Sequence, residues 1–459
     1  MRTQGIVLSL ALAACAGTGA RSDEQASGNG GDESDPGASP SDPTDQGKKP
    51  PKHGNVTCAP DNGGIMLPDG FCATIFADNL GKARHIAVTP KGYVFIAVMP
   101  AMPGGTDDRV VALFDADDDG VAERQETISD LGGNGIAWQD GKLYVAANDR
   151  VVRFDLPDGQ MTPDDPTPVV MVKDLPATPD HAAKTVVLSG RTMFVHIGSA
   201  SNSCQVANRQ LQSPGIDPCL ELETRAAVWS FDADRTDQTL SCGLRVATGM
   251  RNVNALALEP KTDMLWGAIN GRDQLHENWP QLFTEDDDKE LPAEEVVAIT
   301  KNLDRGWPYC YYDARAKEMK LAPEYGGDGE EQGRCASIPP PQFAIAGHAA
   351  PLAMEFSSGN QFPAAFRKGA FISNHGDRFD ALATGELHGY DVEFAPISNG
   401  KPAGDIVKFA TGFDAGMRPL PAAAPHRPVG LAMMPDGSLL IGDDKGGRVW
   451  RVFFTGDKK

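Results

Sequence analysis

Several absences narrow the classes of protein that this sequence can encode. The 459 residues contain no CxxCH motif, which argues against a covalently attached c-type haem. Basic residues are scarce relative to acidic ones: 42 Lys and Arg stand against 63 Asp and Glu. The resulting net charge of −21 argues against nucleic acid and anionic membrane surfaces as partners. The apolar run at residues 6–14 is too short to cross a bilayer as a mature helix.

The N-terminus reads as an export signal followed by a tether. Arg2 precedes the apolar run, and Leu12-Ala13-Ala14-Cys15 has the form of a bacterial lipobox, in which the Cys is lipidated. The alternative is an ordinary signal peptide with an incidental Cys. Residues 16–56 are rich in Gly, Ser, Asp and Pro and lack the apolar residues needed for a core. We therefore expect a lipoprotein signal peptide at 1–15, a disordered linker at 16–56, and a body anchored in the bacterial cell envelope only through its lipid.

The body, residues 57–457, is dominated by short β-rich runs bounded by Gly, Pro, Asp and Asn, and long helical patterns are scarce. A hairpin unit recurs, with a strand, a turn carrying Pro, Asp or Gly, and a second strand. Its copies lie at 85–98, 135–147, 185–198, 255–269, 352–374 and 430–444. Six copies predict an all-β fold, a six-bladed β-propeller, with insertions after residue 200 and between 272 and 350. An array of β-sandwiches is the competing interpretation.

Seven cysteines follow Cys15, and export permits disulfide bonds. Close spacing suggests the pairs Cys58–Cys72, Cys204–Cys219 and Cys310–Cys335, which leaves Cys242 over. The sequence does not determine this connectivity.

Ordered segments of the body resemble one enzyme family. They include "LPDGFCATIFADNLGKARHIAV" at 67–88, "DHAAKTVVLSGRTMFVHIGSASNSC" at 180–204, "ATGMRNVNALAL" at 247–258, "RGWPYCYYD" at 305–313 and "HRPVGLAMMPDGSLLIGDDKGGRVWRV" at 426–452. The chain is similar to the glucose/sorbosone dehydrogenases that depend on pyrroloquinoline quinone (PQQ), and most similar to the sorbosone-dehydrogenase-like branch. This resemblance implies PQQ and Ca²⁺ as cofactors. It also implies oxidation of a sugar or sugar aldehyde by hydride transfer to the quinone, with electrons passed to a separate acceptor.

The resemblance assigns candidate site residues. His181, just before the third hairpin, corresponds to the base that takes the proton of the anomeric hydroxyl, although Ser199 stands where soluble glucose dehydrogenase has an orienting Asp. Arg251 is expected to contact the cofactor near its reacting carbonyl, with Asn252 and Asn254 beside it. The remaining assignments are Arg427 and Arg378 as carboxylate-binding residues, and the backbone of Gly271 and Arg272 as calcium ligands.

A second metal signal does not depend on the resemblance. "DADDDGVAERQE", residues 115–126, has the D-x-D-x-D-G spacing of a calcium loop with Glu at position twelve. Asp115, Asp117, Asp119 and Glu126 would supply the oxygens, and Gly120 the turn. No helical pattern flanks it, so we expect a stiffened loop between strands; an acidic surface turn is the alternative.

Two other functions fit the same fold. Calcium-dependent lactonases are six-bladed propellers that hold their channel metal with Asp, Asn and Glu side chains, and the sequence shows no such set near the expected axis. A non-catalytic cell-surface binding propeller with a decayed cofactor site is favoured by Ser199 and by the altered fifth hairpin, "HGDRFDAL" at 375–382. Fold alone does not choose between these functions.

Overall fold

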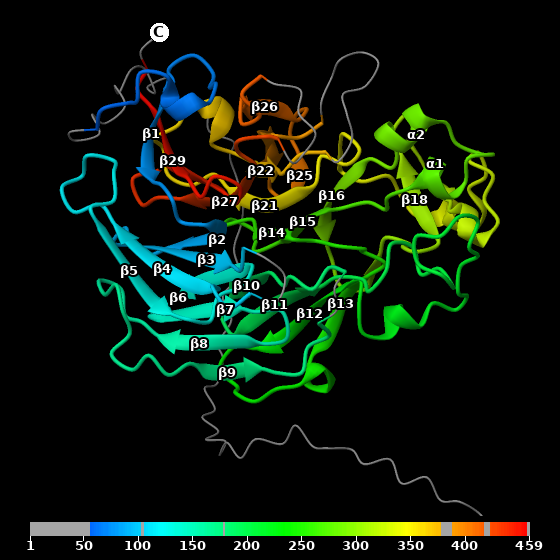
Figure 1. Ribbon diagram of the computed structural model, residues 1–459, viewed down its shortest axis with the longest axis horizontal. Coiled ribbons are helices and arrows are strands. Elements are labelled where there is room, and N and C mark those ends of the chain that lie inside the picture. The colour runs from blue at the N-terminus through cyan, green and yellow to red at the C-terminus, as the bar shows by residue number, and fades with distance from the viewer. Residues whose placement is uncertain (1–55, 102–104, 178–179, 378–387, 417–422, 457–459) are drawn as a thin grey trace, which may run out of the picture. The chain divides into compact units, whose positions relative to one another are not determined.

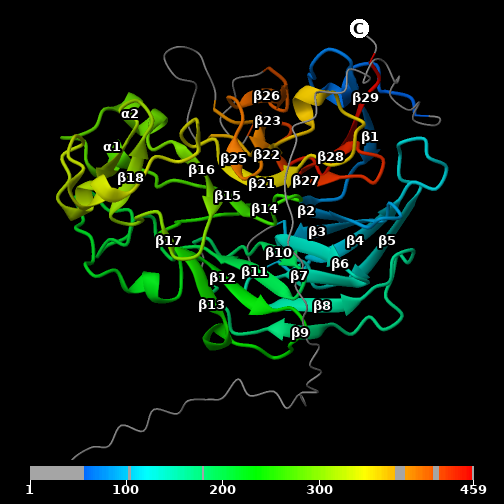
Figure 2. The same cartoon turned by 180° about the vertical axis from the view of Figure 1, so that it is seen from behind.

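The β-rich repeats form antiparallel sheets that follow one another around a common axis (Figures 1 and 2). The computed structural model describes residues 56–101, 105–177, 180–377, 388–416 and 423–456. The first three sheets comprise β2 (Lys82–Val88), β3 (Val94–Met99), β4 (Arg109–Phe114) and β5 (Arg124–Ser129); β6 (Gly135–Gln139), β7 (Lys142–Ala146), β8 (Val151–Asp155) and β9 (Val169–Val172); and β10 (Val186–Ser189), β11 (Thr192–Ile197), β12 (Ala227–Asp232) and β13 (Leu244–Thr248), which β17 (Leu303–Asp304) extends.

The other three sheets complete the ring, and the last of them joins the two ends of the described chain. They comprise β14 (Ala255–Leu258), β15 (Leu265–Ile269), β16 (Glu294–Ile299) and β20 (Phe343–Ile345); β21 (Pro351–Phe356), β22 (Ala370–Asn374), β23 (Asp391–Ala395) and β26 (Val407–Ala410); and β27 (Pro428–Met433), β28 (Leu439–Asp443), β29 (Val449–Phe454) and β1 (Phe71–Ala77). Each hairpin recognised in the sequence is the innermost strand pair of one sheet, so the expected six-bladed propeller is confirmed.

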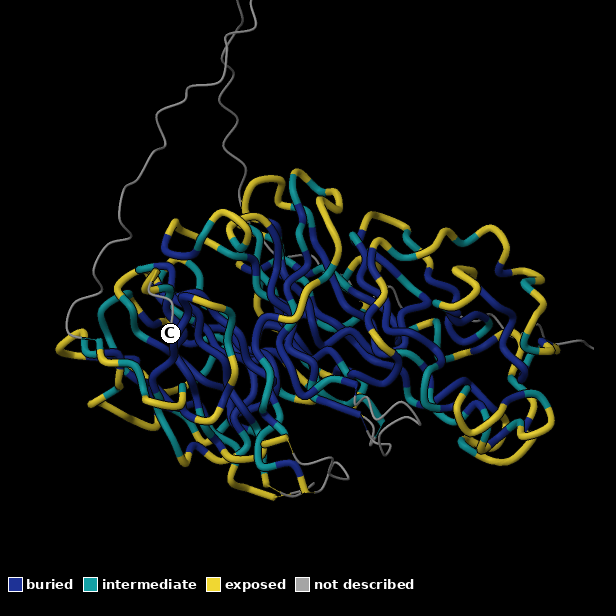
Figure 3. The backbone as a smooth tube through the Cα atoms, turned by 90° about the horizontal axis from the view of Figure 1, so that it is seen from above, coloured by how far each residue is buried: buried dark blue, intermediate teal, exposed yellow. Residues whose placement is uncertain are grey.

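Alternation along each strand explains why the blades stack. Val94, Ile96 and Val98 of β3 pack against the sixth blade, whereas Phe95 and Ala97 pack against the second. Six apolar clusters of this kind fill the six interfaces between consecutive blades. Since side chains of a strand point alternately to its two faces, a central strand must be apolar at nearly every position, and Figure 3 shows this buried interior beneath exposed loops.

The ring closes by pairing strand β1 with strand β29. Phe71 pairs with Phe454 and Ile75 with Trp450, so residues nearly 400 apart in sequence share one blade. This pairing satisfies the backbone groups of β29 that face β1 and ties the two ends of the described chain into one blade.

Insertions lie where the sequence predicted them. Residues between β11 and β12 form one excursion, and residues between β15 and β20 form another that carries α1 (Leu275–Asn278), α2 (Glu285–Glu290), β18 (Cys310–Asp313) and β19 (Glu318–Leu321). A further hairpin, β24 (Ile397–Ser398) and β25 (Lys401–Pro402), follows β23. Within the described ranges, no helix has the length and apolarity needed to cross a membrane.

The three expected disulfide pairs are present: Cys58–Cys72, Cys204–Cys219 and Cys310–Cys335. No described cysteine is a free thiol, and this includes Cys242, which spacing alone left over. The signal peptide with its lipobox, all but the last residue of the linker, and Arg378 lie outside the described residues.

Candidate functional site

A ring of buried polar contacts joins all six blades where their inner strands begin. Each contact links one blade to the next: Arg84 Nε to Asn134 Oδ1 (2.8 Å), Asn134 Nδ2 to Lys184 O (3.2 Å), Thr185 Oγ1 to Asn254 O (2.8 Å), Asn270 Nδ2 to Pro351 O (3.0 Å), Ser373 Oγ to Val429 O (2.5 Å) and Arg84 Nη1 to Asp444 Oδ2 (2.6 Å). Because inner strands converge on the axis, residues that precede them meet there whatever their separation in sequence.

His181 lies at this end of the third blade in a conformation set by its neighbours. Its φ is 51°, and it follows Asp180 in the turn that precedes β10. A Cβ on Gly198 would lie 2.5 Å from the Cβ of His181 and 3.0 Å from Oδ1 of Asn252. Only glycine therefore allows the imidazole and this amide to pack against the end of β11.

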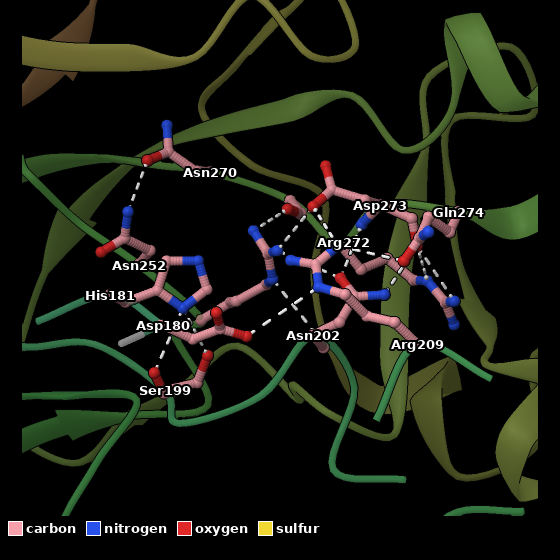
Figure 4. A network of polar contacts seen from close by, with 12 residues as sticks. Asp180, His181, Ser199, Asn202, Arg209, Asn252, Asn270, Arg272, Asp273 and Gln274 are labelled. Carbon is pink, nitrogen blue, oxygen red and sulfur yellow. Dashed lines mark hydrogen bonds and ion pairs between the residues drawn. The ribbon is translucent and has the colours of Figure 1, made fainter. Parts of the chain in front are cut away.

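Hydrogen bonding fixes which nitrogen of His181 carries the proton. Nδ1 lies 3.0 Å from Ser199 Oγ and 3.2 Å from Ser199 O (Figure 4). The Ser199 hydroxyl donates to Ser201 O at 2.6 Å, so it can only accept from His181. Nδ1 is therefore the donor, and Nε2 keeps its lone pair for an incoming proton.

Electrostatics keep this imidazole neutral. Burial, and then the charge of Arg251, lower the pKa of His181 to about 3. At neutral pH His181 is therefore a proton acceptor rather than an imidazolium. A bound anion near Arg251 would offset that cation and raise the basicity of the imidazole.

Arg251 is fixed by a buried network. Its Nε and Nη2 donate to the O and Oδ1 of Asn202, both at 3.1 Å, and its Nη1 donates to Gly271 O at 2.5 Å. Nη2 also contacts Asp273 Oδ2 at 2.9 Å. Although burial opposes ionisation of Asp273, Arg251 holds the pKa of that carboxyl well below its usual range. Asp273 is thus the anion that retains Arg251 in the interior.

The segment expected to bind calcium adjoins this network. Gly271 N donates to Glu294 Oε2 at 2.5 Å, and burial raises the pKa of Glu294 to about 7. Arg272 is buried and paired with Glu324. The side chain of Arg272 is therefore occupied by Glu324. The candidate calcium ligands in this segment are the backbone oxygens of Gly271 and Arg272.

A second group of residues lines a cavity of about 660 Å³ at the axis. Among the described residues that line it, Lys82, Arg84, Arg427 and Lys445 are cations and Asp444 is the one carboxylate. Arg427 donates through Nε to His375 O (2.9 Å) and through Nη2 to Gly376 O (2.7 Å). Ala183, two residues beyond His181, also lines the cavity, so this positive pocket reaches the segment that carries the imidazole.

Two expected amides lie in the same neighbourhood. Asn252 donates through Nδ2 to Asn270 Oδ1 at 2.8 Å, while its own buried Oδ1 has no hydrogen-bond partner among the residues that the structure describes. Asn254 contributes its backbone oxygen to the polar ring, and its Oδ1 likewise accepts no hydrogen bond from the described part of the chain. Buried acceptors without a protein donor are costly, and a bound water or ligand would satisfy these two.

The acidic loop at 115–126 is partly as expected. Carboxylate oxygens of Asp115, Asp117 and Asp119 lie within 4.8 Å of one another, but the fourth member is Glu123, not Glu126. Glu126 lies on β5, opposite Ala112, with its side chain 3.3 Å from Arg124. The structure does not bring Glu126 to the other three carboxylates, because the chain enters a strand here, whereas an EF-hand helix would return position twelve to the loop.

Sequence reasoning missed several residues of this region. Lys82, Arg84, His375, Asp444 and Asp273 were not identified as a set. The sequence did carry one signal. Lys82 and Arg84 lie at the start of the first inner strand, and His181 and Arg427 precede the third and sixth inner strands. Aligning the six repeats would therefore have placed these four residues at the same end of the blades.

Comparison with known proteins agrees with this architecture. The TrAA12-like family model matches residues 65–453. The chain belongs to the TrAA12-like family. This confirms the relationship to PQQ-dependent sugar dehydrogenases inferred from the sequence motifs. A protein of Borreliella burgdorferi without assigned function is 24% identical over 398 residues, which cover 85% of this chain and 91% of that protein.

Solved structures share the fold of this TrAA12-like chain. The calcium structure of the Trichoderma reesei carbohydrate-active enzyme of family AA12 is 18% identical, with a TM-score of 0.68 over 88% of this chain and 99% of that one. The PQQ domain of pyranose dehydrogenase from Coprinopsis cinerea is 17% identical, with a TM-score of 0.67 over the same shares. The soluble aldose sugar dehydrogenase of Escherichia coli is 14% identical, with a TM-score of 0.52 over 84% and 99%.

Proposed function

We propose that this protein is a PQQ- and calcium-dependent dehydrogenase that oxidises a sugar or sugar aldehyde. The observation that carries the proposal is the pairing of two features at one end of the axis. One is a neutral imidazole with Nε2 available, and the other is a cavity with four cations against one carboxylate. Membership of the TrAA12-like family, and PQQ-dependent sugar dehydrogenases among proteins of the same fold, support it.

The residues of the cavity suit a planar tricarboxylate. Arg84 and Arg427 are anchored by protein acceptors, yet Nη2 of Arg84 and Nη1 of Arg427 make no hydrogen bond to the described protein, so each retains donors for a carboxylate. About 660 Å³ lies within the usual range for cofactor pockets. Arg251, Asn252 and Asn254 are proposed as further contacts, and Arg378 as one from outside the described residues.

In the proposed reaction, bound PQQ would accept the hydride from the sugar carbon. The chain's own residues would manage the proton. Nε2 of His181 would take it from the hydroxyl on that carbon, while Ser199 Oγ and O hold the Nδ1 proton in place. Arg251 would then face a developing negative charge from a position fixed by Asn202 and Asp273, so little reorganisation would be needed.

Two calcium ions are part of the proposal. At the cofactor site, the backbone oxygens of Gly271 and Arg272 would be the protein ligands; Gly271 O already accepts from Arg251, and its second lone pair remains for a cation. Asp273 supplies negative charge beside this loop. The loop of Asp115, Asp117, Asp119 and Glu123 would hold a structural ion.

The location and the acceptor complete the proposal. We infer export through the signal at 1–15 and anchoring in the bacterial envelope through lipidated Cys15. A separate acceptor would receive the electrons. Because the chain carries a net charge of −21, a basic acceptor should react more slowly as ionic strength rises.

Reconstitution tests this function against its alternatives. The protein without residues 1–15 is titrated with PQQ and Ca²⁺ and then supplied with a panel of aldoses and sugar aldehydes, with absorbance of the quinone and dye reduction as readouts. Sugar-dependent reduction supports the proposal, and His181→Ala should abolish it with the PQQ affinity unchanged. Failure to bind PQQ at micromolar concentration would reject it; lactone hydrolysis with Ca²⁺ alone would favour a lactonase, and sugar binding without turnover a binding propeller.

A further inference from the structure

The first insertion carries a hairpin that reaches the site. Cys204–Cys219 closes it, Gln205 pairs with Gly215, and Val206 N donates to Pro214 O at 2.9 Å. At its turn Arg209 has a φ of 59°, and its N–H donates to Gln205 Oε1 at 2.9 Å. A disulfide and a cross-strand pair therefore hold the backbone of Arg209 in one place.

Arg209 extends from this hairpin toward Asp180, the neighbour of His181 (Figure 4). Its Nη1 contacts Asp273 Oδ2 at 3.1 Å and Gln274 Oε1 at 3.0 Å, and its Nε lies 3.9 Å from Asp180 Oδ2. That last distance is an ion pair without a hydrogen bond. Among the described residues, Nη2 and Nε of Arg209 therefore have no hydrogen-bond acceptor.

Exposure separates Arg209 from the buried cation next to it. Side chains of Arg209 and Asp180 are 32% and 33% exposed, whereas that of Arg251 is 5% exposed. Arg251 donates through Nε, Nη1 and Nη2 to protein acceptors, whereas Nε and Nη2 of Arg209 remain as donors near the imidazole. Arg209 and Asp180 are therefore partly solvent-accessible charges of the network around His181.

Charge distinguishes this region from the cofactor cavity. Here two carboxylates, Asp180 and Asp273, lie among two guanidinium groups, Arg209 and Arg251, and His348 also contacts Asp273 at 3.5 Å. The cavity around Asp444 has one carboxylate among four described cations. The pair of Arg209 and Asp180 offers an ionised donor and an ionised acceptor to a neutral molecule, and vicinal hydroxyl groups, which both donate and accept, match that pair.

We propose that Arg209 and Asp180 form a hydroxyl-binding subsite that selects a neutral polyhydroxylated substrate beside His181. The inference rests on the proposed function and adds the element that determines specificity, which is the disulfide-closed hairpin. Arg209 would donate from Nη2 and Nε to one substrate oxygen, and Asp180 would accept from the neighbouring hydroxyl.

Single-deoxy sugars test the subsite in the PQQ-loaded protein. The best aldose of the panel is compared with its monodeoxy derivatives in the wild type, Arg209→Met and Arg209→Lys. In the wild type, one derivative should lose about 10- to 100-fold in kcat/KM, the effect of one hydrogen bond to a charged group. Arg209→Met should reduce kcat/KM for the parent aldose by a similar factor, mainly through KM, and should remove the difference between parent and derivative. Relative to Arg209→Met, Arg209→Lys should restore part of the kcat/KM for the parent aldose and part of the difference between parent and derivative.

Controls separate recognition from structural damage. Arg191→Met removes an exposed arginine that pairs with Asp232 and Asp234, and should leave every sugar unchanged. Equal losses by Arg209→Met for all sugars, or a weakened PQQ affinity, would show that Arg209 only supports Asp273 and would overturn the proposal. Unchanged kcat/KM in Arg209→Met would overturn it as well. A wild type that binds PQQ but oxidises no sugar would instead refute the function on which the subsite rests.

Discussion

The substitution Ser199→Ala tests how the Ser199 hydroxyl holds the Nδ1 proton of His181. The Oγ of Ser199 accepts from His181 Nδ1 at 3.0 Å and donates to Ser201 O at 2.6 Å, and the side chain is fully buried. Ser199→Ala deletes both bonds, and no bulk water replaces them. The backbone oxygen of Ser199, 3.2 Å from Nδ1, remains, so the imidazole should keep its tautomer and lose only part of its anchorage.

The expected magnitude follows from one neutral hydrogen bond. A contribution of about 1 kcal/mol corresponds to a loss of about fivefold in kcat, far below the ~10⁴-fold loss that accompanies a wrong tautomer in a serine protease triad. Stability should fall by about 1–3 kcal/mol because Ser201 O loses its donor. PQQ affinity should not change.

Single-turnover reduction of the PQQ-loaded protein measures this, with Ser241→Ala as a matched control on an exposed serine of the same blade. Wild-type kcat in a folded Ser199→Ala protein would refute the role of the hydroxyl. A loss of a thousandfold or more would show that the backbone oxygen does not preserve the tautomer.

Three further predictions concern the cofactor, the core and the acidic loop. Arg427→Met should weaken PQQ binding by about 10- to 100-fold in calorimetric titration, since a charged donor is lost, whereas exposed Lys301→Met should have no effect; equal affinities would contradict the assigned pocket. Burial lowers the pKa of His85 to about 4, below its unfolded value of 6.5, so the unfolded chain binds the proton more tightly. The stability this neutral imidazole provides is therefore present above pH 6.5 and is lost as pH falls toward 4. Other buried histidines, including His181, also lose stability in this range, so between pH 7 and 4.5 His85→Gln should reduce the loss seen in denaturant unfolding by about 2–3 kcal/mol; an unchanged slope in that variant would reject the assignment. Calcium should raise the melting temperature, Asp117→Asn should abolish the gain and Glu126→Gln should keep it; the reverse pattern would restore Glu126 as the ligand.

Patterns among neighbouring residues predict most of the fold. Each hairpin copy contains its own turn residues and a period-two apolar pattern, and both depend only on neighbours in sequence, so all six inner strand pairs were predictable. Closure by β1 and β29 was not predicted, since nothing within "FCATIFA" states which distant strand it will pair with.

The sequence by itself therefore determined a six-bladed ring, its insertions, and a histidine and arginines at the starts of inner strands, whereas it only suggested the disulfide pairs. Only the tertiary structure decided that Asp273 retains Arg251, that Arg209 of a distant hairpin faces Asp180, and that Glu123 lies beside the three aspartates of the acidic loop. The physical reason is the sequence separation of the residues involved. Strands and turns depend on patterns within roughly ten neighbouring residues. The partner of a buried charge instead depends on which blades and insertions the closed ring brings into contact.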